Sequence, residues 1–126
     1  MWERHGAEPP DAAATDLENR TFIFAKRVRK FIKGLPRTIA HIEDSKQLVK
    51  SSGSIGANYI EANESLSKKD FILRVKICRK EAKESRYWLR LIETDDNSDQ
   101  EKERIDLIDE TTELMNIFGS IIRKCE

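Results

Sequence analysis

The strongest constraint on the fold of this chain is a heptad pattern of apolar and small residues between positions 71 and 92. The intervals between these residues alternate strictly between four and three positions. Such intervals bring side chains onto one face of an α-helix, and a single helix cannot bury that face alone. The pattern therefore predicts a helix that packs within a bundle or a coiled coil, with a core face formed by Phe71, Val75, Cys78, Ala82, Ser85, Leu89 and Ile92.

Three further segments have helical periodicity, so we predict that the chain is all-α. The second helix is expected over about 38–63, the third after a Ser67 cap, and the fourth after a capping box of Ser98 and Glu101. The predicted connections have only about four or five residues, which makes consecutive helices antiparallel neighbours. The expected architecture is an antiparallel up-and-down four-helix bundle.

The first 14 residues show no periodicity and contain a Pro9-Pro10 pair. They predict a flexible leader. Thr15 and Glu18 have the spacing of a capping box, so the first helix is expected to begin at Thr15. The predicted domain organisation is a leader over 1–14 and one bundle domain over 15–126.

The apolar residues of the first helix lie in one row, namely Leu17, Phe24, Val28 and Phe31. In the second helix the expected core face consists of Ile39, Ile42, Val49, Gly56 and Ile60. In the fourth helix it consists of Ile105, Ile108, Thr112, Met115, Gly119 and Ile122. Gly53 and Gly56 make the middle of the second helix unusually small, which indicates either a loop or the close approach of a neighbouring helix. We favour close approach, because the apolar periodicity resumes in phase beyond it.

The fourth helix has a second apolar row, and the third helix has apolar residues outside its main row. One interpretation is a wide core stripe in a monomer, and the other is an interface of a homo-oligomer. We favour the oligomer, whose predicted interface contains Leu107, Leu114, Phe118, Ile121 and Trp88.

The formal net charge is zero, but charges are distributed unevenly along the sequence. An acidic row of the fourth helix (Asp99, Glu103, Asp106, Glu110, Glu113) and a basic row of the third (Arg79, Lys83, Arg86, Arg90) are expected to neutralise each other, within or between subunits. The basic residues near the first helix form either an ordinary solvated face or a phosphate-binding face. This candidate nucleic-acid site contains Lys26, Arg27, Arg29, Lys30, Lys33 and Arg37.

The sequence offers little for catalysis. Its two histidines, His5 and His41, do not follow a glutamate at the spacing that di-metal bundles use, so no metal site or cofactor is expected. No phosphate-binding loop or nucleophile motif is present, so we expect no enzymatic activity and no small-molecule substrate. Cys78 is expected to be a small buried residue, and Cys125 to lie in a frayed end. The sequence shows no signal peptide and no membrane span, so the expected location is the cytoplasm.

Three stretches carry a resemblance to a known family: Val49–Ala62 with its small-residue interior, Asp70–Ile72, and Arg79–Leu89. Over roughly residues 15–125 the chain resembles the bacterial four helix bundle protein family, which includes proteins encoded in intervening sequences of large-subunit ribosomal RNA genes. It is similar to the accessory variability determinant of diversity-generating retroelements.

The resemblance implies a bundle without catalytic residues and a ring-like homopentamer. Through the retroelement proteins it also implies a reverse-transcriptase-type partner and nucleic-acid binding by basic surface. We interpret Asn58 and Glu61 as a buried structural pair beside Gly53 and Gly56.

The leading hypothesis is a non-catalytic, oligomeric bundle that binds RNA, DNA or a nucleic-acid-processing partner. The alternatives are a protein–protein scaffold whose charges serve assembly only and, more remotely, a metal-dependent bundle enzyme.

Overall fold

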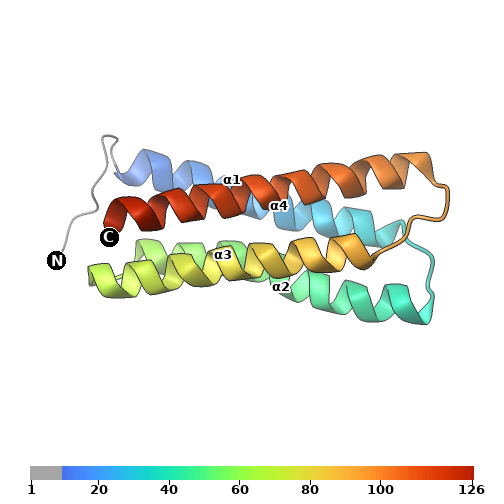
Figure 1. Ribbon diagram of the computed structural model, residues 1–126, viewed down its shortest axis with the longest axis horizontal. Coiled ribbons are helices and arrows are strands. Elements are labelled where there is room, and N and C mark those ends of the chain that lie inside the picture. Colours follow the sequence, from blue (N-terminus) through green and yellow to red (C-terminus); the bar gives the residue numbers. More distant parts are fainter. Residues whose placement is uncertain (1–9) are drawn as a thin grey trace.

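The computed structural model describes the backbone of residues 10–126 and the side chains from residue 16 onward. This part of the chain contains four α-helices and no strand: α1 (Pro10–Lys33), α2 (Ile39–Asn63), α3 (Lys68–Leu91) and α4 (Ser98–Cys125). The helices lie side by side as a rod, and each runs antiparallel to the one before it (Figure 1). The predicted all-α, antiparallel up-and-down four-helix bundle is confirmed.

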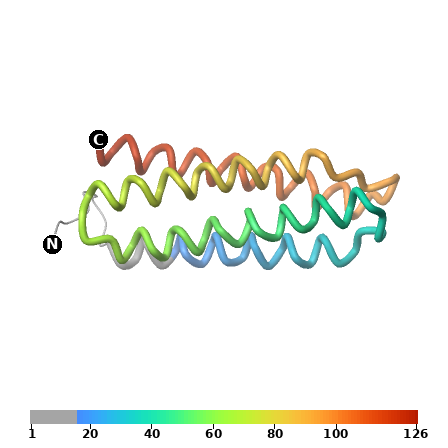
Figure 2. Tube along the Cα trace, turned by 90° about the horizontal axis from the view of Figure 1, so that it is seen from below, coloured from blue at the N-terminus to red at the C-terminus, as the bar shows by residue number. Residues whose placement is uncertain are grey.

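Each helix contacts the next one in chain order, and α4 closes the arrangement by contacting α1. Figure 2 shows α1 beside α2 and α3 beside α4 along the length of the rod. Contacts are most extensive between α2 and α3 and sparsest between α1 and α4. α4 therefore has one flank toward α3 and the other toward α1.

The first helix begins at Pro10, five residues before the predicted start at Thr15. Proline is compatible with a helix start because the first amide groups of a helix have no intrahelical acceptor. The predicted leader is therefore helical over its last five residues, and its first nine lie outside the described residues.

The N-terminal ends of α3 and α4 test two predicted caps. Ser67 caps α3, because its Oγ accepts a hydrogen bond from the Asp70 amide at 3.1 Å. The cap of α4 is Asn97 and not Ser98, since the Asn97 side chain accepts from the Gln100 amide at 3.0 Å. The predicted capping box of Ser98 and Glu101 is therefore wrong by one residue.

The core rows predicted for α1 and α3 are confirmed, because all their members are at least nine-tenths buried. Thr21 joins the α1 row as a fully buried polar side chain. The Thr21 hydroxyl forms its hydrogen bonds within its own helix. Its Oγ1 donates toward the carbonyl oxygens of Leu17 and Glu18, at 3.0 and 2.9 Å. The largest fully buried side chains of the molecule are Tyr59, Phe24, Phe31, Phe71 and Phe118.

The orientation of α4 differs from the prediction. Leu107, Leu114 and Phe118, predicted at an oligomer interface, are all 0% exposed within one chain. In the row predicted for the core, Gly119 and Ile122 are buried as predicted, but Ile105 is 47% exposed. The physical reason is area: the row with two leucines and a phenylalanine removes more apolar surface from water than the row containing Thr112 and Gly119.

The orientation of α2 was also predicted wrongly. Ile39 and Ile60 are 85% and 49% exposed, whereas Leu48, Ile55 and Tyr59 are buried to 1% or less. The larger row again faces the core, and the predicted face instead lies along the outer boundary with α1.

Both cysteines are buried, Cys125 as well as Cys78, so the predicted frayed end at Cys125 is wrong. Cys125 is the last residue of α4 and packs into the same core as Ile122.

Candidate nucleic-acid interface

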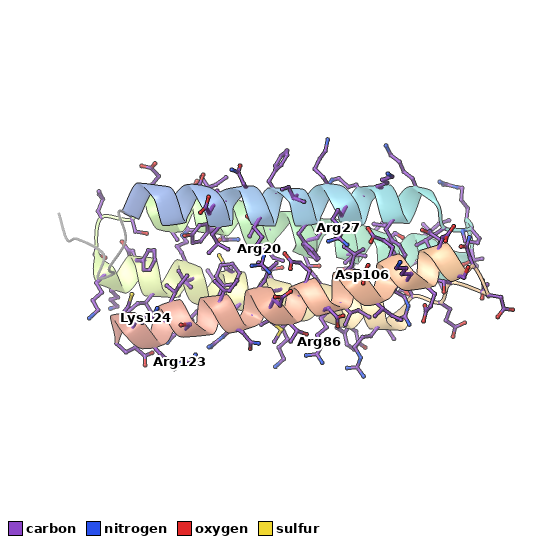
Figure 3. All side chains as sticks on the ribbon, turned by 90° about the horizontal axis from the view of Figure 1, so that it is seen from above. Arg20, Arg27, Arg86, Asp106, Arg123 and Lys124 are labelled. Atoms are coloured by element: carbon purple, nitrogen blue, oxygen red, sulfur yellow. The ribbon has the colours of Figure 1, made fainter. Side chains whose placement is uncertain are left out.

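Three carboxylates of the acidic row of α4, those of Glu103, Glu110 and Glu113, pair with α1. Arg20 donates two hydrogen bonds to Glu110, both at 2.8 Å, and Arg27 contacts Glu103 at 2.8 Å. Figure 3 shows Arg20 and Arg27 between the two helices. The expected neutralisation of α4 by the basic row of α3 is therefore wrong within one chain, because these carboxylates lie on the other flank of α4.

These pairs also change the predicted nucleic-acid site. The hydrogen bond with Glu110 raises the pKa of Arg20, and that with Glu103 raises the pKa of Arg27. Since the guanidinium of Arg27 is held by Glu103, it is not free to contact a phosphate. Arg27 is therefore removed from the candidate site.

The other predicted residues of this site remain at the surface. Lys26, Lys30 and Lys33 are exposed and form no ion pair with any described side chain. Arg29 donates to the carbonyl of Ala25 at 3.1 Å and lies over α2, whereas Arg37 is exposed just before α2. The structure thus leaves the three lysines and Arg29 exposed on α1, with Arg37 beyond the end of that helix.

A second basic surface has no acidic partner. Arg79, Lys83 and Arg90 are exposed and Arg86 is half-buried. None of these four forms an ion pair within the described part of the chain. At 1.5 Å per residue, the row extends about 17 Å along α3. We call Arg79, Lys83, Arg86 and Arg90 the α3 basic row.

The α3 basic row lies on the flank of α3 next to α4. A Cβ atom added to Gly119 of α4 would be 4.0 Å from Nη1 of Arg79 and 3.3 Å from Nη1 of Arg123, so both guanidinium groups cover the same glycine. In Figure 3 Arg86 and Arg123 project from one edge of the bundle, away from Arg20 and Arg27. Nε of Arg86 is buried and has no hydrogen-bond partner among the described residues.

This flank of α4 adds almost no negative charge. It contains the outward-facing part of the apolar and neutral row predicted for the core, with Ile105 exposed and Met115 half-buried. Glu101 is already bound by Arg104 at 2.7 Å and by Thr94 at 2.9 Å. The hydrogen bonds from Arg104 and Thr94 lower the pKa of Glu101 to about 2. The boundary between α3 and α4 is thus a basic surface without competing carboxylates.

The small residues of α2 behave partly as predicted. A Cβ atom at Gly56 would lie 2.9 Å from Oγ1 of Thr21, so α1 does approach α2 closely there. At Gly53 the only nearby atom is Nη2 of Arg29, at 3.3 Å. The side chain of Asn58 accepts from Arg74 of α3 at 3.2 Å, and Glu61 is exposed, so the predicted buried pair of Asn58 and Glu61 is wrong.

Two members of the predicted oligomer interface retain exposed surface. Trp88 and Ile121 are half-buried against the core, and the Trp88 ring meets Tyr87 edge-on at a centroid distance of 5.1 Å. They lie on different helices and, unlike Leu107, Leu114 and Phe118, can still contact another molecule.

Titratable groups in the interior have structural partners. Nε2 of His41 lies 2.8 Å from the carbonyl oxygen of Glu93, to which it must donate, and Nδ1 lies 2.9 Å from Oγ1 of Thr38. Burial raises the pKa of Cys78 to about 12, which keeps the thiol protonated. No cluster of three or more metal-ligating side chains occurs among residues whose side chains are described, and His5 lies outside them. In the described region no helix is long and apolar enough to cross a membrane.

Comparison with known proteins gives one family match and a structural neighbour. The model of the 23S rRNA-intervening sequence protein family matches residues 15–120. The bundle is similar to the crystal structure of a protein of unknown function from the S23 ribosomal protein family of Bacteroides thetaiotaomicron, with 29% identity and a TM-score of 0.71. The similarity covers 87% of this chain and 97% of that one. Comparison with curated proteins gave no match.

Proposed function

We propose that this chain, which belongs to the 23S rRNA-intervening sequence protein family, is a non-catalytic homo-oligomeric protein that binds nucleic acid. The α3 basic row, together with Arg123, would contact the phosphates. One observation carries the proposal: these cations form no ion pair with any described side chain, whereas Glu110 and Glu103 of α4 are engaged by Arg20 and Arg27 of α1.

Phosphate binding follows from the chemistry of this row. Each cation that neutralises a phosphate releases condensed counterions, and guanidinium groups can bind phosphate oxygens in a bidentate manner. The row lies along one helix, so its cations are spaced in a line that can follow a phosphate backbone. The expected binding is therefore to the backbone of RNA or DNA, with little dependence on base sequence.

Several parts of the proposal rest on the family resemblance. These are a ring-like pentamer as the assembly and a reverse-transcriptase-type protein as a partner. The proposed location, the cytoplasm, rests instead on the expectation from the sequence. The exposed Lys26, Lys30 and Lys33 of α1 are a second candidate for phosphate contact. A scaffold whose charges serve only assembly is the alternative function, favoured by the exposed apolar residues outside the α3 basic row.

Fluorescence anisotropy with labelled structured RNA and duplex DNA, at low and near-physiological salt, tests the proposal. Replacing Lys83 and Arg90 together with glutamate should weaken binding ~10-fold or more and reduce the slope of log K against log salt by about two. Lys102→Glu with Lys124→Glu changes the charge equally on α4 and should leave the affinity near that of the wild type. The corresponding double variant, Lys30→Glu with Lys33→Glu, measures how much the α1 lysines contribute to the affinity.

No binding at low salt would overturn the nucleic-acid proposal and leave the scaffold function. Binding that survives in the Lys83 and Arg90 variant but is lost in the Lys30 and Lys33 variant would move the interface to α1.

A further inference from the structure

The outer boundary between α1 and α2 contains an apolar hollow of about 370 Å³. Phe22 and Ile60 line it and are 64% and 49% exposed, which is unusual for large apolar side chains. Lys26 and Arg29 stand at its rim. The one carboxylate in its lining, that of Glu18, already accepts a hydrogen bond from Nδ2 of Asn63 at 2.8 Å. We call this surface the α1–α2 hollow.

Gly53 belongs to the α1–α2 hollow and is not explained by packing within one chain. Gly56 is needed because Thr21 lies against it, but at Gly53 a Cβ would meet only the end of the flexible Arg29 side chain. Glycine in a helix interior is unfavourable relative to alanine. A glycine at this point keeps the hollow open toward solvent, where another molecule can approach the α2 backbone.

A second surface has complementary chemistry. It lies where α2 ends and α3 begins, and it contains the exposed side chains of Leu66 and Leu73, at 75% and 57%. Three carboxylates surround them, those of Glu61, Glu64 and Asp70. The one cation in this lining, Arg74, donates a hydrogen bond to Asn58. We call this surface the α2–α3 corner.

We propose that the α1–α2 hollow of one copy receives the α2–α3 corner of a second copy, an inference that rests on the proposed homo-oligomer. Phe22 and Ile60 would bury the leucines of the corner, which accounts for the exposure of large apolar side chains on both surfaces. Lys26 and Arg29 would face Glu61 and Glu64 of the partner copy. Each surface is complementary to the other and not to itself, so the contact is heterologous.

The two surfaces lie beside each other on the bundle. The α1–α2 hollow reaches Ile60, and the α2–α3 corner begins at Glu61 and extends past the end of α2. They occupy adjacent faces of the bundle that share α2, rather than opposite faces. Each copy therefore has its two neighbours at an angle to each other.

Sedimentation velocity and light scattering of the full chain test this contact by charge exchange. Lys26→Glu with Arg29→Glu should raise the dissociation constant of the oligomer ~100-fold or more, and Glu61→Lys with Glu64→Lys should do the same. Combining all four substitutions reverses both surfaces and should restore the wild-type mass. Lys102→Glu with Lys124→Glu is the control for charge alone, and circular dichroism checks that each variant is folded.

The outcomes separate this contact from the proposed oligomer. A wild-type chain that stays monomeric overturns both. An oligomer that survives both charge reversals, or a fourfold variant that stays dissociated, overturns the pairing of these two surfaces.

Discussion

Two glycines three positions apart in α2 should respond to alanine with opposite signs. At Gly56 a new Cβ would lie 2.9 Å from Oγ1 and 3.3 Å from Cβ of Thr21. The Thr21 side chain is buried, and its hydroxyl is bonded to the carbonyls of its own helix, so it cannot move without losing those bonds. Overpacking of this kind costs ~1–3 kcal/mol, while the better helix propensity of alanine returns about 1 kcal/mol. We expect Gly56→Ala to destabilise the fold by about 1 kcal/mol.

Gly53→Ala is the matched variant. Its Cβ would meet only Nη2 of Arg29 at 3.3 Å, the far end of an exposed side chain that can shift. The propensity gain is then not offset, so the free energy of unfolding should rise by about 1 kcal/mol. The two variants should therefore differ by about 2 kcal/mol, although each adds one methyl group to the same helix.

Urea denaturation followed by circular dichroism at equal protein concentration measures this difference. Thermal midpoints should move in the same directions, by about 3–5 °C per kcal/mol for a chain of this size. A tenfold change of protein concentration separates stability of the bundle from assembly. In a Thr21→Ala background the penalty of Gly56→Ala should disappear. If Gly56→Ala stabilises the protein as much as Gly53→Ala, the close contact of α1 with α2 at Thr21 is refuted.

Three further perturbations follow from buried and paired groups. A double-mutant cycle with Arg20→Ala and Glu110→Ala should give a coupling free energy of about 0.5–1 kcal/mol. This coupling should decrease in 1 M salt, because the Arg20 side chain is 37% exposed. Zero coupling at low salt would contradict the bidentate pair. Leu114→Ala should lower the free energy of unfolding by about 2–5 kcal/mol without changing the sedimentation mass, whereas a changed mass at wild-type stability would place Leu114 at an interface. Because the pKa of Glu101 is lowered to about 2, chiefly by Arg104, its contribution to stability is complete above the ordinary value of 4.5 and is lost as the pH falls toward 2. Carboxyl NMR titration should find this value, and a midpoint near 4.5 in the wild type would contradict it, while Arg104→Met should move the midpoint up.

The elements of the fold could be read from the sequence. Strict four-and-three spacing placed the whole core face of α3 correctly, from Phe71 to Ile92, because the other apolar residues of that helix do not form a second continuous row. Local chemistry likewise placed the Ser67 cap and the short connections that make neighbours antiparallel.

The rotation of α2 and α4 could not be read in this way. Both helices carry two apolar rows about 100° apart, and periodicity alone does not rank them. The row that faces inward is the one whose burial removes more apolar surface across the assembled bundle, as Leu114 and Tyr59 do. Ranking the two rows of each helix requires knowing which surfaces of the neighbouring helices pack against them.

The candidate site shows the same division between sequence and tertiary structure. The sequence by itself determined that α3 has a basic row and α4 an acidic row, each at helical spacing. It did not determine whether those rows meet, because α4 lies between α3 and α1 and either neighbour could face its acidic flank. The handedness of the bundle decides which neighbour faces the acidic flank of α4. In this bundle Glu103 and Glu110 lie against α1. The charge left over on α3 is a consequence of tertiary structure alone.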